Sequence, residues 1–243
     1  MNFLIQGFTV LLYNPLFNAL VLLYLYLPGR DFGIAVIILT VLIRIILYPL
    51  MVNSLKSQKA LSEIQPKMKE IQEKYKNDKE AQTKEMMALY QKEKINPLGG
   101  CLPLLIQLPI LIALYQVFMK GLVPGTMHHL YSFIPNPGTI NTSFLGLINL
   151  TEPNIVLAVL SGIIQFFQTK TMTPQKKNTE GKKDQMSQFS DIMQKEMLYF
   201  FPVLTVFILW KLPSAIGLYW IVTGLFSIYQ QMMVNRETKL KTI

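Results

Sequence analysis

An arginine lies near the middle of a long apolar segment of this chain. Residues 32–53, FGIAVIILTVLIRIILYPLMVN, are long enough to cross a hydrocarbon core of ~30 Å as a helix, and Arg44 is the 13th of these 22 residues. A charge at that depth costs ~2.5–3.5 kcal/mol on insertion scales. The nearest acidic residues all lie at the ends of apolar segments or outside them: Asp31, Glu152, Glu196 and Glu237. We therefore expect Arg44 to face water held inside a helical bundle; the alternative is that it bonds carbonyls or amide side chains purely for packing.

Four further apolar segments are predicted to be membrane-spanning helices. They cover residues 98–119, 153–171, 197–212 and 215–235, and Pro213-Ser214 makes a tight helical hairpin of the last two. Only 15% of the 243 residues are charged and the mean hydropathy is +0.33, whereas a soluble domain carries about 25% charged residues. The sequence therefore predicts an all-α polytopic membrane protein with five transmembrane helices, the first at 32–53.

The amino-terminal residues 1–31 leave two alternatives open. The stretch 3–27 is apolar, but Asn14-Pro15 interrupts it. The part after the interruption, residues 16–27, is too short to cross a bilayer. We interpret it as a helix lying in the membrane interface; the alternative is a sixth span.

Basic residues concentrate in the segments that connect the spans. Residues 54–97 contain ten lysines, six more lie from Lys170 to Lys195, and the tail 236–243 has three basic residues, whereas residues 121–151 contain no Lys or Arg. This asymmetry explains the net charge of +9 by membrane topology, without a basic face for nucleic acid. With the amino terminus outside and the carboxyl terminus in the cytoplasm, we expect an outer loop at 120–152 and cytoplasmic segments at 54–97, 172–196 and 236–243.

The segment 54–97 has the pattern of a helical hairpin. Asn77-Asp78 separates two helical stretches, and the first carries an apolar seam with a spacing of three and four residues. The seam consists of Leu61, Ile64, Met68, Ile71 and Tyr75. Because only one good apolar stripe is present, the hairpin is either a solvated connector or a contact surface for a partner or an incoming chain.

Uncharged polar residues accompany Arg44 in the predicted spans. They are Thr40 in the first span, Gln107 and Gln116 in the second, Ser161, Gln165, Gln168 and Thr169 in the third, and Tyr219 or Trp220, Thr223, Ser227 and Gln230 in the fifth. Any one of them could make an ordinary interhelical hydrogen bond. Four spans with polar faces and one arginine together favour a shared hydrophilic cavity.

The residues that would build a catalytic or metal site are missing from the sequence. The single cysteine, Cys101, excludes an intramolecular disulfide and a cysteine-built metal site, and the two histidines, His128 and His129, both fall in the predicted outer loop. No acidic pair lies within the spans, and no serine sits in a nucleophile elbow. We therefore expect no enzyme activity, no metal and no cofactor.

Four blocks of the sequence resemble the YidC family of membrane protein insertases. The resemblance extends from about Leu16 to Asn235, and its blocks are LIRIILYPL around Arg44, Pro66-Lys67, LYQKEKINPLGGCLPLLIQLPILIALY at 89–115 and LPSAIGLYWIVTGLFSIYQQ at 212–231. The large outer domain of some Gram-negative members and the long basic tail of other members have no counterpart here. The chain thus resembles the short bacterial form.

The resemblance implies a five-helix core around a positively charged hydrophilic groove, which opens to the cytoplasm and to lipid. The family's groove arginine corresponds to Arg44, its groove glutamine to Gln165 or Gln168, and its groove aromatic residue to Trp220. Pro66 joins the seam residues in the hairpin at 54–97. The expected substrate groove then comprises Arg44, Thr40, Gln107, Gln165, Gln168, Trp220 and Thr223.

The implied function is that of an insertase and chaperone, which moves nascent hydrophobic segments from the cytoplasm into the bilayer. Its partners would be nascent membrane proteins and lipid, with the Sec translocon and the ribosome as further candidates and no direct recognition of nucleic acid. No transit-peptide pattern is evident, which favours a bacterial plasma membrane. The rival is a small transporter or channel with a polar cavity, although transporters usually show internal repeats and none is found here.

Overall fold

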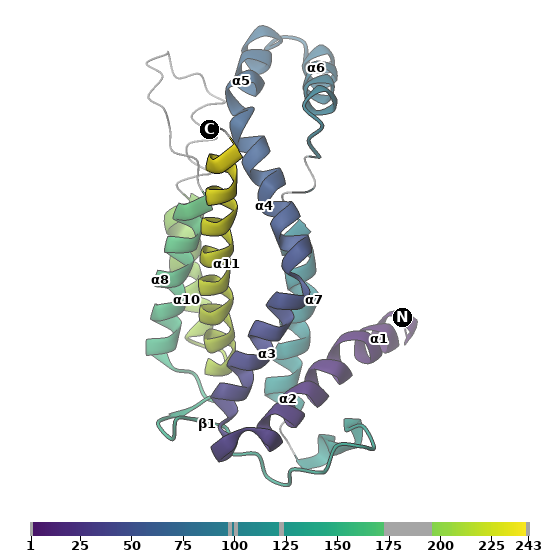
Figure 1. Ribbon diagram of the computed structural model, residues 1–243, viewed down its shortest axis with the longest axis vertical. Coiled ribbons are helices and arrows are strands. Elements are labelled where there is room, and N and C mark those ends of the chain that lie inside the picture. Colours follow the sequence, from purple (N-terminus) through teal and green to yellow (C-terminus); the bar gives the residue numbers. More distant parts are fainter. Residues whose placement is uncertain (1, 97–98, 100–101, 122–123, 173–195, 242–243) are drawn as a thin grey trace.

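The structure is a computed structural model that describes all residues except 1, 97–98, 100–101, 122–123, 173–195 and 242–243, so most of the predicted loop 172–196 lies outside the described residues. Most of the described chain is helical. Figure 1 shows an elongated bundle with a pair of short helices at one end and a looped segment at the other. The helices of the bundle are α3 (Phe32–Ile46), α4 (Tyr48–Glu63), α7 (Leu102–Gln116), α8 (Ile155–Met172), α10 (Phe201–Leu209) and α11 (Ser214–Lys241).

The amino-terminal segment is one continuous helix, which leans away from the bundle in Figure 1. It runs through α1 (Asn2–Phe8), a π-helical turn η1 (Thr9–Tyr13) and α2 (Asn14–Tyr26). The predicted interruption at Asn14-Pro15 is therefore wrong. Pro15 has no N–H and its ring crowds the carbonyl four residues earlier, but the wider π-helical turn just before it shifts the hydrogen-bond pairing by one residue, as the bond from the Asn14 N–H to the Thr9 carbonyl shows.

The segment predicted as the first span, residues 32–53, is bent. Helices α3 and α4 meet at Leu47 with an angle of 65° between them. Pro49 lies in the first turn of α4, where a residue without an N–H is tolerated but cannot continue the preceding helix. The bend directs the second half of the segment out of the bundle towards the helical pair at its end.

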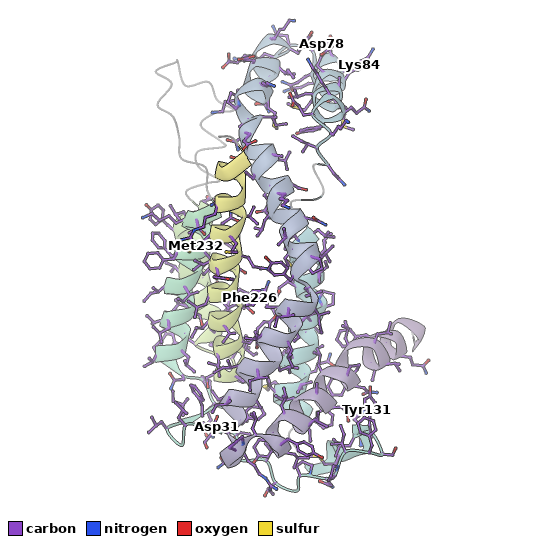
Figure 2. The ribbon with its side chains drawn as sticks, in the orientation of Figure 1. Asp31, Asp78, Lys84, Tyr131, Phe226 and Met232 are labelled. Atoms are coloured by element: carbon purple, nitrogen blue, oxygen red, sulfur yellow. The ribbon has the colours of Figure 1, made fainter. Side chains whose placement is uncertain are left out.

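The helical pair consists of α5 (Gln65–Lys74) and α6 (Lys79–Lys92), which pack against each other. The predicted break at Asn77-Asp78 is confirmed, because Asp78 caps α6 by accepting the Ala81 N–H. The seam predicted to continue through the first helix is divided at Ile64, where α4 ends. Figure 2 shows Asp78 and Lys84 at this end of the molecule.

An ion pair closes the helical pair near its base. The Lys67 ammonium lies 2.6 Å from Glu93 Oε1 and holds the pKa of that carboxyl below its usual value. Gln82 Nε2 also donates to the Gln72 carbonyl at 3.1 Å. Both contacts link residues of the first helix with residues of the second.

Helix α8 packs between α10 and α11 through small residues. Ser161 Oγ donates to the Gly217 carbonyl of α11 at 3.1 Å, and a Cβ atom on Gly162 would lie only 3.0 Å from the Pro202 carbonyl oxygen of α10. Gly224 lies against Ile164 in the same way. Small residues let helix backbones approach closely where lipid gives no hydrophobic drive for association.

The opposite end of the bundle is closed by the segment between α7 and α8. Here β1 (Ser143–Phe144) and β2 (Ile148–Asn149) form a two-stranded hairpin, whose turn uses positive φ angles at Leu145 and Gly146. The labelled Asp31 lies at this end in Figure 2; it caps α3 by accepting the Ile34 N–H and also accepts the Leu145 N–H at 2.5 Å. One carboxylate thus joins the start of α3 to the hairpin turn.

The start of α11 and the amino-terminal helix are tied to the same segment. The N–H groups of Ser214 and Ala215 donate to the carbonyls of Glu152 and Leu150, which satisfies donors that the first turn of a helix leaves free. The buried Asn18 of α2 donates to the His129 carbonyl and accepts the Tyr131 N–H. Asn18, a polar residue in a mainly apolar helix, therefore holds the loop backbone at His129 and Tyr131 against α2.

The helices differ in how well they satisfy the requirements of a membrane span. By length and apolar composition Ile5–Tyr26 qualifies alone, and α3 with α4 qualifies as a bent pair. Leu105–Met119, Ile155–Thr171 and Glu196–Leu209 are apolar but shorter. Many large apolar side chains on these helices are exposed, as a lipid-facing surface requires, among them Leu105, Ile112, Ile163, Phe167, Val203, Phe207 and Leu225.

Candidate functional site

Arg44 is buried in the last turn of α3, with 6% of its surface exposed. Its Nη2 donates a 3.2 Å hydrogen bond to Oε1 of Gln107 on α7. In the described part of the chain, no carboxylate forms an ion pair with Arg44. The partner that the structure gives the guanidinium is therefore an uncharged amide.

Gln107 connects Arg44 to a third helix. Its Nε2 donates to the hydroxyl of Tyr219 on α11, and the Tyr219 side chain is buried. Arg44, Gln107 and Tyr219, which we call the Arg44 cluster, therefore join α3, α7 and α11. Of the alternatives Tyr219 and Trp220 left open by the sequence, the structure places Tyr219 in this cluster.

A second polar cluster lies where α8, α10 and α11 meet. Oε1 of Gln165 accepts hydrogen bonds from Thr205 Oγ1 at 2.6 Å and from Trp220 Nε1 at 3.0 Å. We call Gln165, Thr205 and Trp220 the Gln165 cluster. Gln165 and Trp220 were predicted from the sequence, whereas Thr205 was not. A signal was present, because Thr205 is the one polar residue in the apolar run FPVLTVFILW.

The other predicted groove residues occupy different positions. Thr40 is buried and its hydroxyl donates to the Val36 carbonyl of its own helix at 2.6 Å. Thr223 is buried on α11, four residues after Tyr219. Gln168 lies beside α11, because its Oε1 is 3.4 Å from where a Cβ atom on Gly224 would be. None of these three contributes a side-chain bond to Arg44 within the described residues.

An apolar cavity of about 280 Å³ separates α7 from α10 and α11. Its residues come from all three helices and from the turn between α10 and α11: Leu111, Ile112, Tyr115, Thr205, Ile208, Leu209, Leu212, Ile216 and Trp220. Two members of the Gln165 cluster, Thr205 and Trp220, belong to its wall. The cavity therefore brings an apolar surface next to polar groups inside the bundle.

Buried polar residues continue along α11 towards the helical pair. Ser227 donates to the Thr223 carbonyl at 2.9 Å, and Gln230 and Gln231 are both buried. Nε2 of Gln230 and Oε1 of Gln231 have no hydrogen-bond partner among the described residues. Sequence analysis found Gln230 from its helical spacing but missed Gln231, which lies on a neighbouring face.

The chemistry that this arrangement supports is binding. A guanidinium carries five N–H donors and can pair with both oxygens of a carboxylate. In the described residues no group of three or more His, Cys, Asp or Glu side chains could hold a metal ion. The site therefore offers a buried cation, amide groups and an apolar cavity for a ligand that is part polar and part apolar.

Comparison with known families gives a match over nearly the whole chain. The model of the family described as the 60Kd inner membrane protein matches residues 23–241. Among individual relatives, the membrane protein insertase YidC of Fusobacterium nucleatum is 36% identical over 207 residues, which cover 85% of this chain and 87% of the relative. The insertase of Geobacter metallireducens is also 36% identical, over 95% of this chain but only 38% of its own length.

A solved structure of an active YidC insertase, with its first transmembrane domain resolved, is similar in fold. It has a TM-score of 0.57 and 25% sequence identity over 89% of this chain and 45% of the solved chain. This chain therefore spans less than half of the solved insertase and of the Geobacter relative. The family match, the relatives and the fold agree, and the chain belongs to the 60Kd inner membrane protein family, the family of the YidC membrane protein insertases.

Proposed function

We propose that this chain is a membrane protein insertase, which moves nascent hydrophobic segments into the bilayer through a groove lined by the Arg44 and Gln165 clusters. The family is one of inner membrane proteins, so the chain lies in the bacterial plasma membrane. The observation that carries the proposal is a buried arginine held by an uncharged amide beside an apolar cavity. The names of the relatives favour this function over a transporter or channel.

The electrostatic part of the proposal concerns the polar flank of a substrate. A carboxylate about 4 Å from a guanidinium gains roughly 4 kcal/mol at an effective dielectric constant of ~20. A hydrogen bond that involves one charged group, as between Arg44 and Gln107, contributes about 1.5–3 kcal/mol. An acidic flank therefore binds Arg44 more strongly than the amide of Gln107 does, and this attraction offsets part of the cost of bringing the flank below the membrane surface.

The apolar part concerns the segment that will remain in the membrane. We propose that it lies along the exposed apolar faces of the bundle, next to the cavity between α7 and α10. Ile112 of α7 and Ile208 of α10 line the cavity and are exposed, so they supply such faces. A segment placed there already contacts lipid. It can therefore pass into the bilayer without crossing polar groups and without any covalent chemistry.

The topology we propose has five spans: α3 with the start of α4, α7, α8, η6 (Glu196–Phe200) with α10, and α11. The amino terminus lies outside and the lysine-rich segment 54–97 lies in the cytoplasm, as the positive-inside rule requires. The helical pair of α5 and α6 is then the first part that an incoming chain meets. Its exposed Met87 would suit an adaptable contact with nascent chains, and the Sec translocon and the ribosome are further proposed partners.

The proposal is tested by changing Arg44 and the substrate flank together. Protein reconstituted in liposomes is given a radiolabelled substrate with either aspartates or asparagines in its flank, and insertion is measured by protease protection. We expect Arg44→Glu to reduce insertion of the aspartate substrate more than tenfold, while Arg44→Lys retains much of it. Insertion of the asparagine substrate should change far less. Equal insertion of the aspartate substrate by the wild type and Arg44→Glu, at equal protein levels, would contradict the role of Arg44.

A further inference from the structure

Gln107 uses both ends of its amide to connect two residues on different helices. Its oxygen accepts from Arg44 of α3 and its nitrogen donates to the hydroxyl of Tyr219 on α11. We propose that Gln107 and Tyr219 are positioning residues that hold Arg44 in place and keep α7 closed against α11 until a substrate carboxylate replaces Gln107 at the guanidinium. This inference rests on the proposed function and adds to it a coupling between recognition of the flank and opening of the cavity.

The geometry allows only one useful orientation of the Gln107 side chain. If the amide were turned over, its NH₂ group would face the guanidinium, which has donors only. The hydrogen bond to Arg44 therefore determines that the nitrogen faces Tyr219. The bonds from Arg44 to Gln107 and from Gln107 to Tyr219 therefore form together. If the bond to Arg44 weakens, the Gln107 amide is no longer held in the orientation that bonds Tyr219.

Helix α7 packs less closely against the helices on the far side of the cavity than against its other neighbours. It packs mainly against α2, α4, η1 and the turn η4 (Val117–Gly121), whereas Leu111 and Ile112 face α10 and α11 across the apolar cavity. Gln107 lies one helical turn before Leu111, at the end of the cavity. The link from Gln107 to Tyr219 is thus placed where it can hold the two walls together.

Helix α7 contains a position at which it can bend. Pro109 lies inside the helix, between Gln107 and Leu111. It has no N–H for the carbonyl of Leu105, and a helix is weakest at such a site. A change in the bonding of Gln107 can therefore move one part of α7 without unfolding the whole helix.

The exchange at Arg44 follows from charge. A carboxylate forms shorter and stronger bonds with a guanidinium than a neutral amide does, so a substrate carboxylate takes the position of Gln107 Oε1. Gln107 then loses its orienting partner, the link to Tyr219 weakens, and α7 moves away from α11. The cavity beside Trp220 widens at the moment when a polar flank is bound, which admits the apolar segment that follows the flank.

The test measures the separation of α7 and α10 by electron spin resonance. Spin labels are placed on Leu108→Cys and Phe207→Cys, two exposed positions, in the full chain with Cys101→Ser, in vesicles of phosphatidylethanolamine and phosphatidylglycerol. The probe is a synthetic apolar segment of about 20 residues with an aspartate-rich flank, and its match carries asparagines instead. We expect the aspartate peptide to move the main distance peak of the wild type to a longer distance, and the asparagine peptide to leave it unchanged.

Two variants separate the role of the link from folding. Tyr219→Phe removes the acceptor of Gln107 and keeps the ring, so it should show the longer distance without any peptide, whereas Tyr229→Phe, on an exposed residue of the same helix, should not. Gln107→Glu supplies a carboxylate that bonds both Arg44 and the Tyr219 hydroxyl, so it should keep the short distance even with the aspartate peptide. A Tyr219→Phe distance equal to that of Tyr229→Phe would overturn the inference.

Failure of the inference differs from failure of the proposed function. If Arg44→Glu impairs insertion but the distance between the two spin labels never changes, the groove function stands. The coupling between flank binding and opening of the cavity is then wrong. If insertion is independent of Arg44, the proposed function fails. The comparison of Tyr219→Phe with Tyr229→Phe still tests the link then, because it uses no substrate.

Discussion

Tyr219 and Trp220 are neighbours in the chain but belong to different polar clusters. The Tyr219 hydroxyl accepts from Gln107 of α7, whereas Trp220 Nε1 donates to Gln165 of α8 at 3.0 Å. Successive residues of a helix point about 100° apart, because a turn takes 3.6 residues. One turn of α11 therefore joins the Arg44 cluster to the Gln165 cluster, and a shift of this helix would affect both.

Replacing Gln165 by leucine should destabilise the bundle more than replacing Thr205 by valine. Gln165→Leu leaves two donors, Thr205 Oγ1 and Trp220 Nε1, without their shared acceptor, and a buried donor without a partner costs about 1–3 kcal/mol. Thr205→Val removes one donor and leaves the bond to Trp220. The unfolding temperature in detergent should rank wild type above Thr205→Val and Thr205→Val above Gln165→Leu. The reverse order for the two variants would show that Gln165 is solvated in the membrane.

Two glycines of the packed helices should respond differently to a methyl group. A Cβ atom on Gly162 would lie 2.4 Å from Val206 Cγ2 and 3.0 Å from a backbone oxygen, whereas one on Gly217 would have its nearest neighbour at 3.5 Å. Overpacking of this kind costs about 1–3 kcal/mol. Thermal unfolding should therefore show a clear loss of stability for Gly162→Ala and little change for Gly217→Ala. Equal behaviour of the two variants would mean that α8 and α10 are less closely packed than described.

Asp31 should contribute more to stability than the other N-cap aspartate, Asp78. Both accept a backbone N–H in the first turn of a helix, but Asp31 also accepts the N–H of Leu145. Loss of an N-cap costs about 0.5–2 kcal/mol, and Asp31→Ala also leaves Leu145 without its acceptor. Asp31→Ala should lower the unfolding temperature more than Asp78→Ala, and Asp31→Ser, which can still cap, should recover only part of the difference. Full recovery by serine would exclude a contribution from the bond to Leu145.

The loop at the end opposite the helical pair should lose stability at acidic pH. Burial, followed by the nearby charge of His128, holds the pKa of His129 below the ordinary value of 6.5. Its ring lies edge-on to Tyr13 and 4.1 Å from the His128 ring, between centroids. The folded state therefore favours neutral His129: its contribution is complete above pH 6.5 and is lost as the pH falls through the lowered pKa.

The measurement for His129 is the unfolding temperature between about pH 7.5 and about pH 5, a window that brackets the histidine pKa. The wild type should lose stability towards the acidic end, and His129→Gln should show a smaller change with pH. Tyr24→Phe, which removes a different contact of the same loop, the bond from the Asn141 N–H to the tyrosine hydroxyl, should keep the pH dependence of the wild type. An identical pH dependence in His129→Gln and the wild type would assign the effect to another group.

Much of the helical arrangement could be predicted, because apolar length and helix-breaking residues are local properties. The segment predicted at 153–171 corresponds to Ile155–Met172, and the break at Asn77-Asp78 is where α6 begins. One prediction about a proline was wrong, and a second proline had an effect that was not predicted. At Pro15 a π-helical turn keeps the helix continuous, and near Pro49 the chain bends by 65°. Both outcomes depend on how the chain around the proline is packed. The presence of a proline in the sequence does not reveal that packing.

Four of the predicted site residues, Arg44, Gln107, Gln165 and Trp220, belong to two clusters that the sequence could not separate. Helical spacing identified Gln107, Gln165 and Trp220 as polar positions in apolar helices, but not their partners. Thr40 has the right spacing to accompany Arg44, yet its hydroxyl is used within its own helix. Hydrogen bonding to the preceding turn is always available to a helical threonine, so spacing alone does not predict an interhelical bond.

The sequence by itself determined that the chain is helical, that it enters a membrane and that Arg44 is buried without an acidic partner in its span. These properties follow from composition along a single segment, since a helix satisfies its own backbone hydrogen bonds in lipid. Only the tertiary structure decided that Arg44 meets Gln107 and, through it, Tyr219. That contact depends on the rotation and height of three helices relative to one another. These are set by how each helix packs against its neighbours, such as α3 against α11 and α7 against α4, and not by the pattern of any one helix.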